Sequence, residues 1–177
     1  MKKIVLLFLL SVSTSFVFSQ QFAYISRDSI LTSIDDYNKN LLQLDSLKTN
    51  YTQELDYMQE QLKQRYNQLL APYGLTGQES IEDIQSTIEP MDSITFSILL
   101  QEDQMLQTKA KSYDNMLNFV FHRDIQPLLD KVNKTITSYS KKNKIDIVYI
   151  IEELSPGLAY INEKKNITGE IIKLLKE

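Results

Sequence analysis

Apolar side chains recur at alternating steps of three and four residues between Ile30 and Leu69, the spacing of a helix that packs along another helix. Ten of the twelve positions in this pattern are apolar. At about 1.5 Å per residue such a helix reaches roughly 60 Å, well beyond the width of a small domain core. The pattern predicts one long, protruding helix. Its positions are Ile34, Leu41, Lys48, Leu55, Leu62 and Leu69 in one register and Ile30, Tyr37, Leu44, Tyr51, Met58 and Arg65 in the other.

A second long helix is expected to return along the first. Proline and two glycines between residues 71 and 77 end the outgoing helix, and residues 71–90 form the predicted tip. The return helix is expected from Met91 to Ser140, with a kink or junction at Pro127. Two helices of similar length and opposite direction make an antiparallel hairpin, which we place at residues 35–124.

The two ends of the chain predict a small strand-containing domain, at residues 20–34 and 125–177. Three short strands are expected, at about 22–26, 145–151 and 158–161, so the fold class is α+β and mostly α. Three short strands make a thin core, and oligomerisation through the sheet is the simplest way to thicken it. The residues assigned to trimerisation are Phe22, Tyr24, Ile145, Ile147, Val148, Tyr149 and Ile150.

Residues 1–19 have the pattern of a cleavable secretory signal peptide. Two lysines precede the apolar run from Ile4 to Leu10, and cleavage is expected between Ser19 and Gln20. The alternative, a membrane anchor, is disfavoured because the uninterrupted apolar run is too short to span a bilayer. The sequence contains no cysteine, which excludes a lipid-modified amino terminus, disulfides and thiol chemistry. We therefore expect a periplasmic protein.

Charge and motif content argue against several classes of function. Removal of Lys2 and Lys3 lowers the number of basic residues from 19 to 17 against 23 acidic ones, a net charge of −6. Such a chain is a poor partner for nucleic acid. His122 is the single histidine, no nucleophile motif accompanies it, and no phosphate loop or metal-ligand spacing is present. The expectation is a protein that is not an enzyme and has no cofactor or metal.

Tyrosine and methionine residues occupy many positions along the predicted hairpin. One interpretation is ordinary packing between the two helices. The other is an adaptable lining for many unfolded sequences, because methionine deforms and tyrosine offers both apolar area and a hydroxyl group. The residues assigned to this client-binding role are Tyr37, Tyr51, Met58, Tyr66, Met105, Tyr113 and Met116.

An opening strand leads directly into the first long helix, and a closing block of strand, turn and short amphipathic helix ends the chain. The residues of these two blocks are Phe22-Ala23-Tyr24-Ile25, Asp28-Ser29-Ile30-Leu31, Lys144-Ile145-Asp146-Ile147-Val148-Tyr149, Ala159-Tyr160 and Asn166-Ile167-Thr168. With this order of elements, the chain resembles the Skp/OmpH-like periplasmic chaperones over essentially the whole mature chain. The closing block has asparagine where the family usually has aspartate.

The resemblance implies a jellyfish-shaped homotrimer, in which strands of three chains form a central body and three helical hairpins surround a cavity. Family members hold unfolded outer-membrane β-barrel proteins in that cavity without ATP. The best-studied members are strongly basic, whereas this chain is acidic. No lipopolysaccharide site is therefore carried over, and contact with membrane or lipopolysaccharide stays open.

Two functions follow from these observations. The first is a periplasmic holdase that keeps unfolded outer-membrane proteins from aggregating. The alternative is a structural envelope protein whose coiled-coil hairpin serves as a spacer or adaptor for one folded partner.

Overall fold

The structure is a computed structural model that describes residues 20–177, and the chain divides into two compact units. The hairpin unit is Asp36–Leu128. The terminal unit comprises the described residues up to Asp35 together with Leu129–Glu177. The expected signal peptide, residues 1–19, lies outside the described residues.

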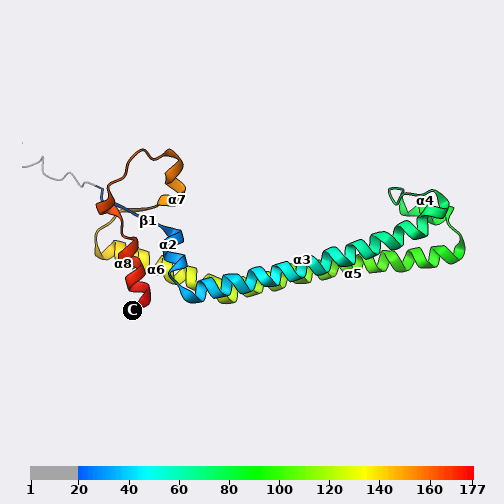
Figure 1. The fold of residues 1–177 in the computed structure, drawn as a ribbon, viewed down its shortest axis with the longest axis horizontal. Coiled ribbons are helices and arrows are strands. Elements are labelled where there is room, and N and C mark those ends of the chain that lie inside the picture. Colours follow the sequence, from blue (N-terminus) through cyan, green and yellow to red (C-terminus); the bar gives the residue numbers. More distant parts are fainter. Residues whose placement is uncertain (1–19) are drawn as a thin grey trace, which may run out of the picture. The chain divides into compact units, whose positions relative to one another are not determined.

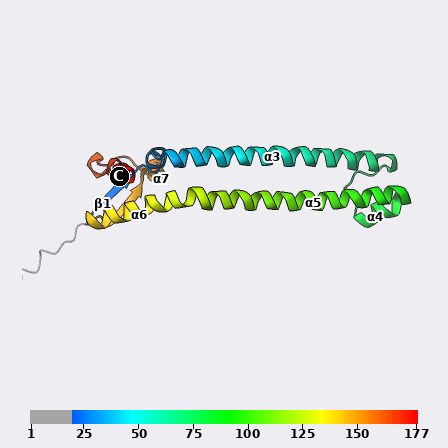
Figure 2. The ribbon, with the colours of Figure 1, turned by 90° about the horizontal axis from the view of Figure 1, so that it is seen from below.

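Two long helices form the hairpin unit, and Figures 1 and 2 show them side by side. Helix α3 is Asp35–Leu70 and helix α5 is Pro90–Val120. Side chains join Glu54 to Lys109 and Arg65 to Glu102, so residue numbers rise along one helix as they fall along the other. The expected antiparallel hairpin and the mostly helical fold class are confirmed.

The tip of the hairpin has its own small core. Gly74 has the left-handed backbone (φ 68°) that ends the 3₁₀ turn Ala71–Tyr73, and Ser80 caps helix α4, Ile81–Thr87. Helix α4 lies where the chain turns between the two long helices (Figure 1). Because a third element packs there, apolar side chains can be enclosed on more than one side. The buried residues of this tip core are Leu70, Ile84, Ile88 and Phe96.

The return helix is continuous but changes form. After α5 comes a π-helical segment, Phe121–Ile125, and then helix α6, Gln126–Lys142. The Gln126 N–H donates to the Phe121 carbonyl, five residues back. Pro127 has no N–H to offer the carbonyl four residues earlier, and a wider turn next to it accommodates that loss. The disturbance expected at Pro127 thus takes the form of this π-helical segment.

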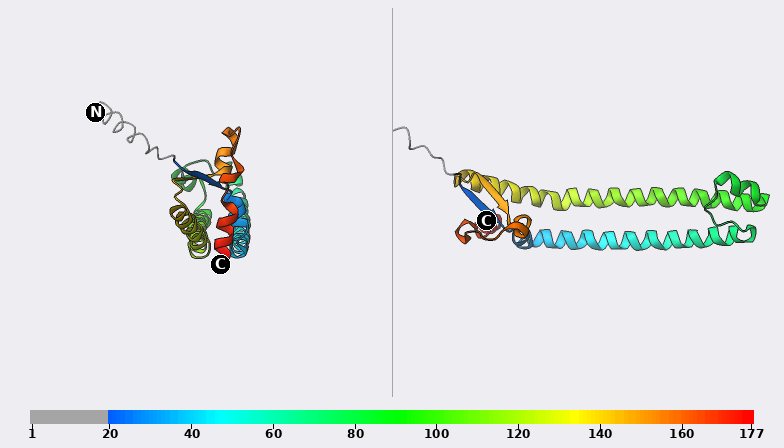
Figure 3. Two further views of the ribbon diagram at one scale, coloured as in Figure 1. Left: turned by 90° about the vertical axis from the view of Figure 1, so that its left-hand side faces the viewer. Right: turned by 90° about the horizontal axis from the view of Figure 1, so that it is seen from above.

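The terminal unit is built on a parallel two-stranded sheet. Strand β1, Phe22–Ile25, pairs with strand β2, Ile147–Ile150, and Phe22 lies opposite Ile147. The two strands are adjacent arrows in Figure 3. Helix α8, Thr168–Lys176, adds an apolar face to one side of the core. The buried core residues are Ala23, Ile25, Ile30, Val132, Ile167, Ile171 and Leu175.

The first long helix does not begin at Ile30, as the apolar pattern predicted. A separate short helix α2, Arg27–Thr32, comes first, and its amino terminus is capped by Ser26. The Ser33 backbone N–H and hydroxyl group both donate to the carbonyl of Ile30, and two residues separate the end of α2 from the start of α3. A serine that bonds its local backbone competes with helix continuation, and the apolar spacing does not register that competition.

The strand expected at residues 158–161 is absent, and the strand expected at 145–151 is shorter. Chain segments after β2 form helix α7, Ile151–Leu154, and 3₁₀ turns at Ser155–Gly157 and Glu163–Lys165. Asn166 instead bridges to Tyr24 on β1, where the Ile167 N–H donates to the Tyr24 carbonyl. With that edge of β1 occupied, residues 158–161 have no pairing partner, and Tyr160 is 81% exposed.

Candidate functional site

Three of the tyrosines assigned to client binding pack inside the hairpin unit. The rings of Tyr51 and Tyr113 stack with centroids 3.8 Å apart and planes within 5° of parallel. Tyr66 meets the edge of Phe96 in the tip core. These contacts join α3 to α5, so the three rings hold the two helices together. Tyr37 is half-buried on α3. Their role in binding a client stays a prediction.

Glu54 joins the two long helices through a polar cluster of Glu54, Lys109 and Tyr113, which we call the hub. One carboxylate oxygen of Glu54 accepts from Lys109 Nζ at 2.5 Å, and the other accepts from the Tyr113 hydroxyl at 2.5 Å. The hydrogen bond from Lys109, followed by that from Tyr113, lowers the pKa of Glu54. The same hydrogen bond raises the pKa of Lys109 above its ordinary value. The stacked tyrosines and the hub lie at the same level, which fixes the register of the two helices.

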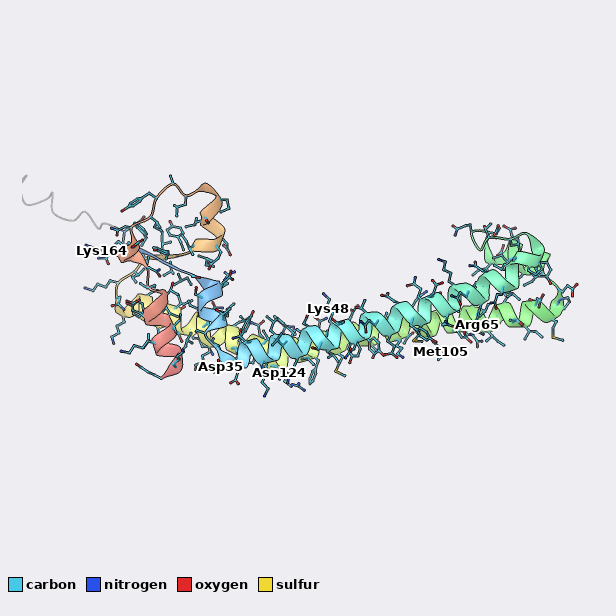
Figure 4. All side chains as sticks on the ribbon, viewed as in Figure 1. Asp35, Lys48, Arg65, Met105, Asp124 and Lys164 are labelled. Carbon is cyan, nitrogen blue, oxygen red and sulfur yellow. The ribbon has the colours of Figure 1, made fainter. Side chains whose placement is uncertain are left out.

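A shallow groove lies between the long helices further along the hairpin unit. Its volume is about 240 Å³ and it contains Met58 and Met105, two of the residues assigned to client binding. The ion pair between Arg65 and Glu102 lies beside it. Figure 4 labels Arg65 and Met105 on neighbouring stretches of the two helices. The structure thus brings a pair of predicted methionines into one depression.

The most extensive exposed apolar surface on the hairpin unit lies along α5. On a helix of 3.6 residues per turn its members occupy a sector of about 80°. Met91 is 74% exposed and Met105 is 69% exposed. The buried residues Phe96 and Leu99 fall on a different sector of the same helix. We call this surface the α5 stripe, and it consists of Met91, Ile94, Ile98, Met105, Met116 and Phe119.

Sequence reasoning found only two members of the α5 stripe, Met105 and Met116. It looked for binding residues only among tyrosine and methionine. The signal that identifies the other four was present in the spacing. Once the buried and half-buried positions of α5 are removed, the remaining large apolar residues share one face.

The charges of the hairpin unit are unevenly distributed. We call residues 66–108 the distal segment, which includes the tip and the first half of the α5 stripe. It contains seven acidic residues and no lysine or arginine. The rest of the hairpin unit, residues 36–65 and 109–128, has seven acidic and seven basic residues. The acidic residues of the distal segment are Glu79, Glu82, Asp83, Glu89, Asp92, Glu102 and Asp103.

The sheet of the terminal unit exposes apolar residues on one face. Phe22 and Ile147 are each 39% exposed, and the ring of Phe22 meets the edge of Tyr149. Tyr24 is buried although it was assigned to the same interface. Alternate strand residues point to opposite faces, so Val148 and Ile150 pack against the core instead. Ile145 is partly buried against the same core.

A carboxylate fastens the segment after β2 to the start of α2. Glu152 accepts from the Ser26 hydroxyl at 2.6 Å and from the backbone N–H groups of Arg27 and Asp28. Burial acts to raise the pKa of Glu152, and the hydrogen bonds outweigh it, so the pKa is lowered. Glu152 and the three residues that donate to it all belong to the terminal unit, so we interpret this contact as one that stabilises that unit.

Among the described residues, no group of three histidine, cysteine or acidic side chains is arranged to hold a metal ion. None of the helices within residues 20–177 combines the length and apolar character needed to cross a membrane.

Comparison with known proteins places the chain in a family. The family model described as outer membrane protein (OmpH-like) matches residues 21–175. No curated protein matches the chain. A crystal structure of a candidate outer membrane chaperone (OmpH-like) from Caulobacter crescentus shares 14% identity, with 89% of this chain and 84% of that chain covered at a TM-score of 0.42. Because the family model spans nearly every described residue, this chain belongs to the OmpH-like outer membrane protein family.

Proposed function

We propose that this protein is an ATP-independent holdase chaperone, which binds unfolded outer-membrane β-barrel proteins in the periplasm and prevents their aggregation. Membership of the OmpH-like family supports the proposal. The observation that carries it is the α5 stripe, because a soluble helix rarely exposes six large apolar side chains on one face without a partner.

The chemistry of the stripe suits a changing partner. Methionine side chains are unbranched and polarizable, so they adapt to different apolar surfaces. Met91, Met105 and Met116 share the stripe with more rigid isoleucine and phenylalanine side chains. Binding of this kind lowers the concentration of free unfolded chain without any covalent step. The proposed function is accordingly not enzymatic and uses no cofactor.

A homotrimer formed through the terminal unit is part of the proposal. An isolated two-stranded sheet is at best marginally stable, and β2 has one edge with no strand beside it in the described chain. The exposed face with Phe22, Ile147 and Tyr149 offers apolar area to other copies. Three linked hairpins would also strengthen weak contacts through multivalency. Export by a signal peptide at residues 1–19 completes the proposed location in the periplasm.

Aggregation of an unfolded client tests the proposal directly. A urea-unfolded outer-membrane β-barrel protein is diluted into buffer with or without this protein, and light scattering is followed. We expect scattering to be suppressed by the natural chain. The triple variant Met91→Ser, Met105→Ser and Phe119→Ser should suppress it much less. A protein that neither trimerises nor delays aggregation would contradict the proposal.

The matched control places the same new residues elsewhere on α5. Gln104→Ser, Gln107→Ser and Asn115→Ser change three exposed polar positions on the same helix, all outside the sector of the α5 stripe. This control carries a similar cost in helix propensity, because serine replaces a better helix former at most of these positions. Equal loss of activity in both triple variants would mean that the α5 stripe is not the binding surface.

One observation favours a different function. The tip core of Leu70, Ile84, Ile88 and Phe96 makes the end of the hairpin a folded element, as a dock for one folded partner would require. A spacer or adaptor of the cell envelope would have such an end. A pull-down that returns one folded partner in fixed stoichiometry, with no unfolded barrels, would favour this alternative.

A further inference from the structure

The distal segment presents an apolar face that nothing in the described chain covers. Met91, Ile94 and Ile98 follow one another at helical spacing on α5, and all three are exposed. Helix α4 packs elsewhere, because its buried residue Ile84 and the adjoining Ile88 join Phe96 in the tip core. Formation of the tip therefore leaves this part of the α5 stripe free to meet a partner.

The charges around this face have one sign. Arg65, just before the distal segment, forms its ion pair with Glu102, and the segment itself adds no further cation. Glu82 and Glu89 are exposed and have no hydrogen bond or ion pair from their side chains among the described residues. At physiological salt the Debye length is about 8 Å, so such carboxylates act on any chain that touches the neighbouring turns.

Carboxylates also stand next to the stripe residues. Glu102 precedes Met105 by three residues and follows Ile98 by four, which makes it a neighbour of both on the helix surface. Glu89 is the N-cap residue of α5, two residues before Met91. The apolar face from Met91 to Ile98 thus lies between two carboxylates along the chain, of which Glu102 also forms the ion pair with Arg65.

We propose that the distal segment selects client segments in which apolar residues alternate with lysine or arginine. This inference rests on the proposed holdase function and names the chemistry of its preferred clients. In an extended chain, alternate side chains point in opposite directions, so apolar groups can lie on the stripe while cations remain in solvent near the carboxylates. Electrostatic complementarity of this kind sets specificity and speeds association, and segments rich in aspartate or glutamate are repelled.

The test measures binding of two labelled peptides to the full-length mature protein. One short peptide contains leucine, serine and lysine, and its counterpart has glutamate in place of every lysine. We expect the lysine peptide to bind at least about tenfold more tightly at low salt, and the difference to shrink as salt is added. Equal affinities for the two peptides would overturn the inference.

Two matched variants show which part of the hairpin unit is responsible for the preference for the lysine peptide. Glu82→Gln, Glu89→Gln and Asp103→Asn remove three charges from the distal segment, and Asp103→Asn keeps an oxygen that can accept from Gln107. Asp45→Asn, Asp56→Asn and Asp114→Asn remove three exposed charges from the remainder of the hairpin unit. Both variants change the net charge equally. The distal variant should weaken binding of the lysine peptide about fivefold to tenfold, and the other variant less than about twofold, because exposed charges interact weakly beyond a Debye length.

The outcomes separate this inference from the proposed function. Suppressed client aggregation with no difference between the matched variants would leave the holdase in place and overturn the charge selection. A charge preference lost only in the distal variant supports the inference. Failure to suppress aggregation, with tight and charge-selective peptide binding, would contradict the holdase and leave the distal segment as a site for cationic peptides.

Discussion

The two long helices are held together by different kinds of contact in the distal segment and in the remainder of the hairpin unit. In residues 36–65 and 109–128 most contact positions of α3 are only half-buried, and cross-helix polar groups such as Glu54 and Lys109 fix the register. The distal segment encloses a core of Leu70, Ile84, Ile88 and Phe96 because α4 adds a third element. One end is a bridged pair of helices, and the other is a small packed fold.

The difference in packing is matched by a difference in charge. Equal numbers of acidic and basic residues accompany the bridged helices, whereas all charged residues of the distal segment are acidic. A segment with its own core can expose Met91 and Ile94 without losing its structure. The residues that stabilise the tip are therefore different from the residues that can bind a partner, and substitutions in the two sets should have different effects.

The largest effect is expected from Phe96→Ala. The Phe96 ring is almost fully buried in the tip core, and its removal should cost about 3–5 kcal/mol. Hydrogen exchange should become faster in the distal segment first. Met58→Ala, at a half-buried position of α3, is the comparison, and its cost should be clearly smaller. Equal costs at both positions would mean that the tip has no separate core.

A smaller loss is expected from Tyr51→Ala. Its ring stacks on Tyr113, and such a pair contributes about 0.5–1.5 kcal/mol beyond the area that it buries. Urea unfolding followed by helical circular dichroism measures the change. Tyr57→Ala on the same helix is the control, because its side chain is largely exposed. If the control destabilises as much, the stack does not join the helices.

Gly74→Ala should destabilise the tip by about 1 kcal/mol. The glycine has a left-handed backbone that an L side chain adopts only at a cost, and a Cβ there would touch nothing within 4 Å. The loss is therefore conformational and not steric. Gly157→Ala also enters open space but needs no left-handed backbone, so thermal unfolding should show little change.

The smallest effect concerns pH and the hub at Glu54. Its pKa is lowered in the folded chain, mainly by the hydrogen bond from Lys109, so its contribution to stability is present above the unfolded pKa and lost as pH falls through the folded one. Urea titrations over an acidic pH series should show this loss, and Glu54→Gln should flatten it. Gln53→Asn, at an exposed neighbouring position that does not titrate, should leave the profile unchanged.

The long helices could be predicted from sequence because their signal repeats over many turns. A seven-residue apolar pattern and the glycines near residue 74 are local features, and they indicated both helices and the turn between them. The break at Ser33 was missed because one side chain that bonds the local backbone does not alter the apolar period. Family membership, expected from the opening and closing blocks, is confirmed by the family match.

The strand at residues 158–161 was predicted wrongly and four residues of the α5 stripe were not predicted, both for a shared reason. Residues 158–161 have strand-like composition, but pairing depends on a distant edge that Asn166 occupies. The stripe residues Ile94 and Phe119 likewise resemble packing residues until the neighbouring helix is placed. Both errors come from long-range contacts, which decide whether an apolar residue lies in a core or on a surface.

The most direct measurement of the central claim is the mass of the soluble species formed when a urea-unfolded outer-membrane β-barrel protein is diluted into this protein. Native mass spectrometry or light scattering after size exclusion resolves the stoichiometry. The holdase account predicts a complex of three copies of this chain with one client and little aggregated material. A free trimer beside an aggregated client would contradict it and would favour the spacer.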